Sequence, residues 1–159
     1  MTGVWLTFII TYSEYPITVS SYHYRAPELL LGMKQYDYSL DMWSFACIFA
    51  GLVCNSFPFV KGRDKSNVEL LRNISGLLGE NEFWNYIEKY GLNGVSEEIL
   101  GAIVNPSEEG RLVLMRSDSA LKSNLALDLI SKVLKVDHQE RLTAREAMEH
   151  PYFDEVRKT

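Results

Sequence analysis

The pattern of hydrophobic and polar residues is most distinctive in Ser39–Cys54, where SLDMWSFACIFAGLVC is the longest mainly apolar run and is polar only near its start. From Met42 onward, apolar residues cover every face of a helical wheel, which is typical of a helix buried on all sides. Ser39 can serve as the N-cap, and Asp41 lies in the first turn, where a carboxylate interacts favourably with the helix dipole. The run therefore predicts a central core helix, and it is too short to cross a bilayer.

Two S/T-x-x-E patterns predict the starts of further helices. Ser66 and Glu69 precede apolar residues at helical spacing, which predicts an amphipathic helix that ends at Gly79. Thr143 and Glu146 repeat the pattern and predict a last short helix that ends before Pro151. Hydrophobic periodicity and Gly, Ser or Pro boundaries predict other helices at residues 27–31, 82–90, 97–104 and 124–136.

The remaining segments predict little regular structure. Residues 1–18 are rich in β-branched and aromatic side chains and predict a short strand followed by an exposed loop. Residues 105–123 are polar apart from 112–115, so we expect an irregular surface insertion. The expected fold class is mainly α, with helices around a central buried helix and little strand.

Composition and charge narrow the class of protein. The chain has 159 residues, of which 47% are hydrophobic and 23% charged, as expected for one soluble globular domain. The net charge of −5 and the absence of a dense Lys/Arg block argue against a nucleic-acid partner or an anionic membrane. Residues 1–10 have no basic start and no small-residue cleavage site, so we expect no signal peptide.

Cys47 and Cys54 are the only two cysteines, and they lie in the same predicted helix. Their backbones are then about 10 Å apart, beyond the roughly 7 Å limit for a disulfide. Buried, reduced thiols suit an intracellular protein, and we interpret both as small core residues. His23, His138 and His150 lack metal-ligand spacing, so no metal site is expected.

Three motifs together resemble the C-terminal lobe of a eukaryotic protein kinase: RAPELL at 25–30, DMWSFAC at 41–47 and HQERLTAREAMEHPYF at 138–153. The resemblance implies that Ala26-Pro27-Glu28 closes the activation segment and that Arg141 pairs with Glu28. A buried Glu28 needs such an opposite charge, and an Arg can give it two hydrogen bonds. The resemblance also implies structural roles for Asp41 and Trp43, with Asp41 as an anchor of the catalytic loop. Because that loop is not among residues 1–159, we expect Asp41 to act in this chain as an ordinary first-turn carboxylate.

Within the kinases, YDYSLDMWS at 36–44 and DHQERLTAREAMEHPYF at 137–153 resemble the catalytic subunit of casein kinase II. This resemblance implies a serine/threonine kinase that acts on proteins in the cytoplasm or nucleus, uses ATP and Mg²⁺, and has a possible regulatory subunit. It also implies a substrate-facing loop with an acidic preference. Here that loop, ITVSSYHYR at 17–25, has Thr18 and Tyr22 where basic residues are expected and a cation at Arg25. We predict substrate contacts at Ser21, Tyr22 and Arg25.

The departures from the family are as informative as the matches. The 159 residues contain no Gly-rich loop for ATP, no H-R-D catalytic loop with its Asn, and no D-F-G metal ligand. We therefore interpret residues 1–159 as a partial kinase domain without catalytic, cofactor or metal residues, inactive alone. The alternative is a pseudokinase-type module that binds partners through the Arg25 loop and residues 112–115.

A consequence of the partial domain is that one side of the central helix lacks neighbours. We expect large side chains such as Trp43, Ile48 and Phe49 to remain uncovered. Each uncovered side chain loses roughly 1.5 to 3 kcal/mol of the free energy that burial would contribute to stability. We therefore expect a marginally folded chain that tends to associate.

Overall fold

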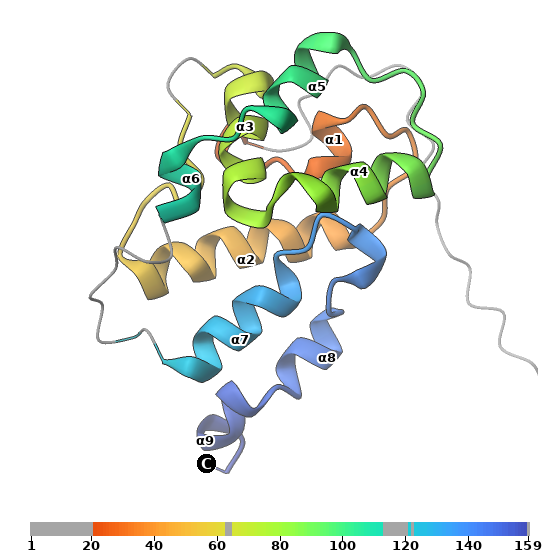
Figure 1. Cartoon of the computed structure of the whole chain (residues 1–159). Coiled ribbons are helices and arrows are strands. Elements are labelled where there is room, and N and C mark those ends of the chain that lie inside the picture. The colour runs from red at the N-terminus through yellow and green to blue at the C-terminus, as the bar shows by residue number, and fades with distance from the viewer. Residues whose placement is uncertain (1–20, 63–64, 113–120, 122, 159) are drawn as a thin grey trace, which may run out of the picture.

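Helix α2 (Ser39–Cys54) runs between two groups of helices (Figure 1). This computed structural model describes residues 21–62, 65–112, 121 and 123–158. The first group is α1 (Pro27–Leu30), α3 (Asn67–Leu78), α4 (Glu80–Lys89), α5 (Glu97–Val104) and α6 (Glu108–Leu112). The second is α7 (Asn124–Val133), α8 (Ala144–Met148) and α9 (Asp154–Arg157), with short 3-10 turns η1 (Tyr22–Tyr24), η2 (His138–Glu140) and η3 (Pro151–Phe153). Throughout the described ranges the regular elements are helical, which confirms the mainly α fold.

The bounds of α2 match the predicted helix, but its N-cap does not. Tyr38 occupies the cap position, and the Asp37 carboxylate accepts a hydrogen bond from the Ser39 amide at 2.9 Å. The Ser39 hydroxyl oxygen is buried and has no partner within the described part of the chain. The prediction of Ser39 as N-cap was wrong because the helix turns one residue earlier and Asp37 can reach its first amides.

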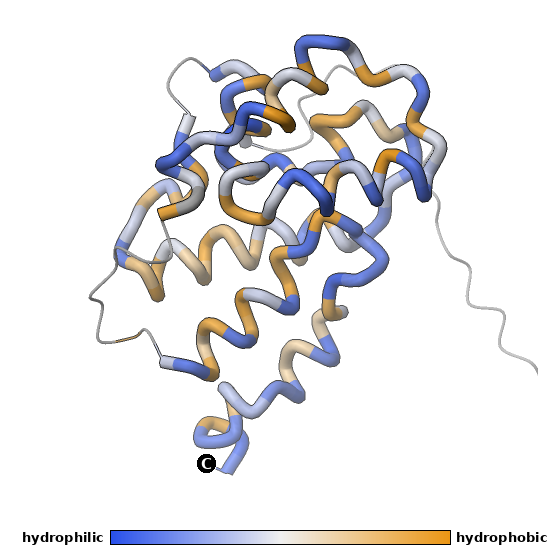
Figure 2. Tube along the Cα trace, in the orientation of Figure 1, coloured by the Kyte–Doolittle hydropathy of each residue, from blue (hydrophilic) through white to orange (hydrophobic). Residues whose placement is uncertain are grey.

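Burial along α2 is one-sided. Seven of its residues are buried: Trp43, Ala46, Cys47, Ala50, Gly51, Val53 and Cys54. Ile48 and Leu52 are instead 47% and 52% exposed, and Figure 2 shows that α2 is largely apolar along its length. The prediction of burial on all sides was therefore wrong. Of the side chains expected to be uncovered, Ile48 is exposed, Phe49 is half-buried and Trp43 is fully buried.

The first group of helices packs around α3. This helix contacts α5 and α6 and buries Leu70, Leu71 and Ile74. Ser66 is its N-cap residue but makes no side-chain capping bond, so the predicted capping box is absent. The Glu69 carboxylate lies 4.0 Å from Arg72 in the next turn instead.

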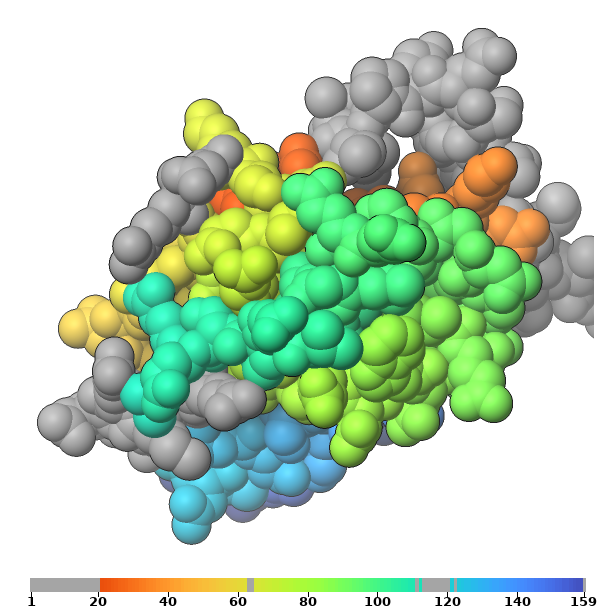
Figure 3. All heavy atoms as spheres, turned by 45° about the horizontal axis from the view of Figure 1, so that its top comes forward, coloured from red at the N-terminus to blue at the C-terminus, as the bar shows by residue number. Residues whose placement is uncertain are grey.

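Three of the helices after α3 differ from the predictions: α7 ends at Val133, three residues before the predicted end at residue 136, and α4 and α6 differ as follows. The start of α4 lies at Glu80, two residues before the predicted position, directly after Gly79 at φ 92°. In α5 the predicted bounds are confirmed, with the Ser96 side chain accepting from the Ile99 amide. A short helix, α6, occurs where we predicted an irregular insertion. Figure 3 shows α3 to α6 as one continuous face.

The second group confirms two predicted helix starts. The Ser123 side chain caps α7, and Thr143 and Glu146 form the predicted capping box of α8. The predicted strand in residues 1–18 lies outside the described residues, as do residues 113–115 of the predicted 112–115 patch. No helix among the described residues is long and apolar enough to cross a membrane.

Both cysteines are buried in α2 and neither forms a disulfide, as the sequence predicts. Burial raises the pKa of the Cys47 thiol to about 12, and the nearby Arg141 charge opposes this only in part. A thiol with such a high pKa is unreactive, because the thiolate is the nucleophilic form. Cys47 is therefore a small core residue rather than a reactive group.

Candidate functional site

The loop at residues 21–25 holds the three predicted substrate-binding residues, and it leads directly into α1. Its 3-10 turn, η1, closes with a hydrogen bond from the Tyr24 amide to the Ser21 carbonyl at 2.9 Å. Ser21 is exposed, whereas Tyr22 and Arg25 are half-buried. The Ser44 hydroxyl of α2 donates to the Tyr24 carbonyl at 3.4 Å, which connects the loop to the central helix.

Three side chains of this loop contact the connection between α2 and α3. The Tyr22 hydroxyl donates to the Ser66 carbonyl at 2.7 Å. The Nδ1 atom of His23 lies 3.1 Å from the carbonyl oxygen of Val60. The third contact is made by Arg25, whose Nη1 donates to the side-chain oxygen of Asn67, the first residue of α3, at 2.7 Å.

Tyr22 also packs directly against Gly62. A Cβ atom on Gly62 would lie 2.3 Å from the Tyr22 hydroxyl oxygen, closer than real contacts allow. The Arg25 guanidinium carbon lies 5.8 Å from the centre of the Tyr22 ring, within the range of a cation–π interaction. The Tyr22 ring therefore lies between a glycine that makes room for it and a cation.

Glu28 and Arg141 form a buried, two-pronged ion pair. Arg141 Nη1 lies 2.7 Å from Glu28 Oε1, Nη2 lies 2.6 Å from Oε2, and both side chains are 0% exposed. The remaining guanidinium hydrogens bond to the carbonyls of Lys135, Ser39 and Val136. All five N–H donors of the guanidinium therefore have acceptors, which is what a buried charge requires. The structure contains the pair that the sequence predicts.

Trp43 and Asp41 lie next to this pair but in different surroundings. The Arg141 guanidinium carbon lies 5.0 Å from the centre of the Trp43 ring, so the fully buried tryptophan packs on the ion pair. Asp41 is exposed and lines a cavity of about 500 Å³ at the start of α2. Asp37, His138 and Thr143 also line it. Its size falls in the range of ligand and peptide sites.

A network around Asp137 holds the segment before Arg141, and the sequence analysis missed it. The Asp137 carboxylate accepts from the Tyr90 hydroxyl at 2.8 Å and from the Gln139 amide at 3.0 Å, and it forms an ion pair with Lys89. Burial alone would raise the pKa of Asp137. The hydrogen bonds outweigh burial, so its pKa lies below the ordinary value. The sequence gives little sign of this network, because Lys89 and Tyr90 lie 48 and 47 positions before Asp137.

Tyr86 and His138 form the buried half of this network. The Tyr86 hydroxyl lies 2.8 Å from His138 Nδ1 and 2.9 Å from the Met33 sulfur. Burial raises the pKa of Tyr86, so the phenol stays protonated at neutral pH. The contact between the neutral phenol and the buried imidazole stabilises the fold.

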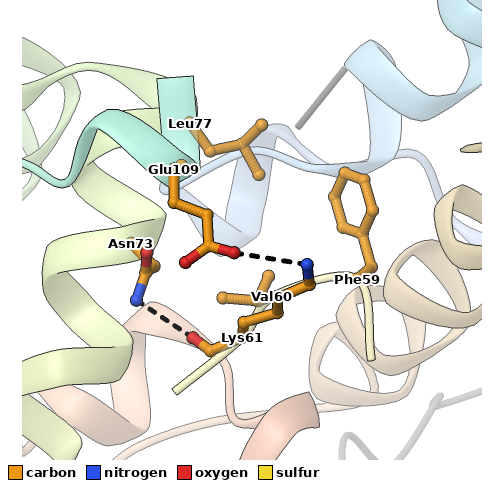
Figure 4. A pocket seen from close by; sticks show the side chains of 7 residues that line it. Phe59, Val60, Lys61, Asn73, Leu77 and Glu109 are labelled. Carbon is orange, nitrogen blue, oxygen red and sulfur yellow. Dashed lines mark hydrogen bonds and ion pairs between the residues drawn. The ribbon is translucent and has the colours of Figure 1, made fainter. Parts of the chain in front are cut away.

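A second, smaller hollow lies between α3, α6 and residues 59–61 (Figure 4). Lys61 and Glu109 form an ion pair across it at 3.2 Å, and Asn73 donates to the Lys61 carbonyl at 3.0 Å. Its volume is about 10 Å³, close to the minimum for one water molecule. The hollow is therefore a packing gap and not a ligand site.

The described residues do not fit a magnesium nucleotide. Among residues 21–62, 65–112, 121 and 123–158, no group of three or more His, Cys, Asp and Glu side chains could hold a metal ion. The sequence has no Gly-rich phosphate loop either. What the arrangement offers chemically is a loop with one cation, a buried ion pair and a cavity with an acidic wall.

The helical fold, the buried Glu28–Arg141 pair and the loop that precedes it are the features of a kinase C-terminal lobe. The family model for the protein kinase domain matches residues 7–153, and the chain belongs to this family. A probable serine/threonine-protein kinase of Dictyostelium discoideum is 39% identical over 149 residues, which is 92% of this chain and 24% of that protein. The chain thus spans about a quarter of the length of this relative.

Proposed function

We propose that this chain is the C-terminal-lobe part of a casein kinase II-like serine/threonine protein kinase. The complete kinase transfers the γ-phosphate of ATP to Ser or Thr of protein substrates, inside the cell, in the cytoplasm or nucleus. The buried Glu28–Arg141 pair carries the proposal, because it ties the end of the activation segment to the C-terminal helices. Similarity to a serine/threonine kinase over most of the chain supports it.

In this proposal residues 1–159 contribute the substrate side and the scaffold of the kinase, while ATP and Mg²⁺ bind elsewhere in the complete protein. Phosphoryl transfer depends on positioned metal, lysine and base. The sequence has no H-R-D or D-F-G motif, and the described residues contain no metal cluster. The chain alone is therefore inactive.

The cavity around Asp41 supports a docking role within the complete kinase. An exposed carboxylate in the first turn of α2 can accept backbone N–H groups of an incoming loop. We assign this position to the catalytic loop, in line with the resemblance of the D-x-W-S stretch to that of kinases. The cavity volume of about 500 Å³ leaves room for such a loop.

We assign substrate recognition to Ser21, Tyr22 and Arg25. A guanidinium can give a carboxylate or phosphate two parallel hydrogen bonds, and this suits one acidic or phosphorylated residue of a peptide. Arg25 keeps its place through Asn67 and the Tyr22 ring. We expect a weaker preference for acidic substrates than in casein kinase II, because Tyr22 stands where a basic residue is expected. A regulatory subunit remains part of the proposal for the complete kinase only.

The alternative function is a non-catalytic interaction module of the pseudokinase type. One observation favours it: loop 21–25 is held by contacts with Val60, Ser66 and Asn67 of this chain itself. A loop ordered in this way can bind a peptide without catalysis. The transcript upstream of the Met1 codon separates the two, because in-frame H-R-D-x-x-x-x-N and D-x-G motifs support the kinase and stop codons support the module.

The direct test is a phosphotransfer assay. We expect the purified chain, mixed with Mg-ATP and an acidic serine peptide, to give only background incorporation, because the groups that position the phosphate are missing. The matched sample is the complete kinase, which should phosphorylate the same peptide. Turnover by the 159-residue chain that survives removal of contaminating kinases would contradict the proposed inactivity.

A further inference from the structure

Residues 59–62, here called the connecting segment, lie between loop 21–25 and α3. On the loop side, the Val60 carbonyl contacts His23 at 3.1 Å, and Gly62 lies directly against the Tyr22 hydroxyl. Phe59 and Val60 are buried in the core. The segment is therefore fixed by its own side chains as well as by the loop.

On the opposite side, Asn73 of α3 holds the same segment. Asn73 is 4% exposed, and its side-chain nitrogen donates to the carbonyls of Lys61 and Glu69, both at 3.0 Å. These bonds use both N–H groups of the amide, so a shift of the segment would leave a buried donor without an acceptor. Because a buried donor without an acceptor is unfavourable, the bond from Asn73 fixes the position of Lys61.

Helix α6 in turn sets the position of Asn73. A Cβ atom on Gly110 would lie 2.2 Å from the Asn73 carbonyl oxygen and 3.0 Å from its carbonyl carbon, so the two backbones touch. Glu109, the neighbour of Gly110, reaches across to Lys61 at 3.2 Å (Figure 4). A continuous series of contacts thus runs from α6 through Asn73 and the connecting segment to Tyr22 and His23.

We infer that the connecting segment couples α6 to loop 21–25, and that Gly62 and Asn73 are positioning residues for substrate recognition. The inference rests on the proposed function, which makes loop 21–25 the substrate-facing loop. The coupling is measured as a change in loop 21–25 after a change at α6.

The first test substitutes Gly62 with Ala. The new Cβ displaces the end of the Tyr22 side chain and breaks its hydrogen bond to Ser66, because the three atoms nearest to it all belong to that side chain. We expect hydrogen exchange of the Tyr24 amide to accelerate about five- to tenfold, the effect of one lost hydrogen bond. Gly94→Ala is the matched control, because a Cβ at Gly94 meets nothing within 4 Å.

A double variant separates positioning from general destabilisation. Tyr22→Leu removes the hydroxyl that meets the new Cβ, so Gly62→Ala should add little to exchange in a Tyr22→Leu background. Two residues in direct contact give such non-additive effects, whereas independent residues give additive ones. Additive acceleration of the Tyr24 amide would overturn the role assigned to Gly62.

The second test perturbs α6, whose contacts described above are with Asn73 and Lys61 and not with loop 21–25. Gly110→Ala pushes on the Asn73 backbone, and we expect faster exchange at Tyr24 as well as in α3. Glu109→Gln breaks only the partly exposed ion pair with Lys61 and serves if Gly110→Ala does not fold; we expect about a twofold acceleration. Changes confined to α3 and α6, with Tyr24 unchanged, would overturn the coupling.

Peptide binding separates this inference from the proposed function. The same variants are titrated with a fluorescent peptide carrying one phosphoserine. Faster exchange together with weaker peptide binding supports both conclusions. Coupled exchange without any peptide binding by the wild-type chain would overturn the assignment of loop 21–25 to substrates, whereas binding that is unaffected by Gly62→Ala and Gly110→Ala would overturn the positioning roles.

Discussion

Helix α2 carries Trp43, which is 0% exposed, near its start, and Ile48 and Leu52, which are 47% and 52% exposed, further along. At the start, the Glu28 carboxylate and the Arg141 guanidinium are buried and paired with each other. On the outer side, apolar groups face solvent. The start of α2 is thus closed by partners from residues 28 and 135–141 of the same chain, while its outer side is available to another surface.

The difference shows that burial of a side chain depends on which partners fold back onto it. Trp43 and Ile48 are both large side chains with an extensive apolar surface, and both were expected to be uncovered. Trp43 is covered by Arg141, whose guanidinium carbon lies 5.0 Å from the centre of the indole ring. The apolar contact area of α2 therefore divides into an internal half that stabilises this chain and an external half that favours association.

The largest effect is expected from breaking the closed side. Arg141→Leu leaves Glu28 as a buried, unpaired charge, which should reduce the free energy of unfolding by roughly 3 to 5 kcal/mol. Urea denaturation followed by circular dichroism measures the change. Arg145→Leu is the control, because this arginine is exposed and should change stability little. An Arg141→Leu curve that matches wild type would contradict the role of the pair.

Asp137 tests how firmly the segment before Arg141 is held. Asp137→Asn removes a carboxylate that accepts from Lys89 and Tyr90, which should cost about 1 to 3 kcal/mol at pH 7. The pKa of Asp137 is lower in the folded chain than its ordinary value of 3.8. Its ionised form therefore stabilises the fold above about pH 4, and this contribution disappears as the pH falls through the folded-state pKa.

The corresponding measurement is the stability difference between wild type and Asp137→Asn at a series of pH values. We expect the full difference between pH 5 and 7 and a smaller one below about pH 4, where the carboxylate becomes protonated first in the unfolded chain and then, at lower pH, in the folded chain. Other carboxylates titrate equally in both proteins and cancel. A difference that grows as the pH falls would contradict the lowered pKa.

Substitutions of two N-cap residues should change the free energy of unfolding less than the substitutions at Arg141 and Asp137. Thr143→Ala removes a capping box next to the Arg141 segment and should cost about 1 kcal/mol. Ser66→Ala, at a cap position whose side chain makes no capping bond, should be nearly neutral. Thermal melts of both variants measure the two costs. Equal losses for the two variants would show that the sequence pattern, and not the observed bond, decides the contribution.

The outer side of α2 should respond least in stability and most in association. Ile48→Lys and Leu52→Lys place a charge on an exposed position, so the unfolding free energy should change by no more than about 0.5 kcal/mol. Binding of a hydrophobic dye and the fraction of oligomer in light scattering should both fall. Val53→Lys, at a buried position, is the contrast and should unfold the chain. Unchanged dye binding in both surface variants would argue against an associating face.

Much of the fold and part of the site were predictable from local sequence. Short-range patterns predict the bounds of α2 and α5, the caps at Ser96 and Thr143, and the start of α7 at Asn124. The Glu28–Arg141 pair was predictable only through the resemblance to kinases, since 113 positions separate the two residues. The Asp137 network and the contacts of Tyr22 with Gly62 and Ser66 were missed, because they join loops distant in sequence.

The sequence by itself determined the bounds of α2 and α5 and the starts of α7 and α8, since capping and hydrophobic periodicity act within a few residues. Only the tertiary structure decided which apolar residues are covered, which capping bonds form and which side chains hold loop 21–25. At Ser66 the local pattern favoured a capping box, but that bond is absent and the Ser66 carbonyl accepts from Tyr22. Such choices depend on partners 40 to 100 positions away, whose approach is set by packing of the whole chain.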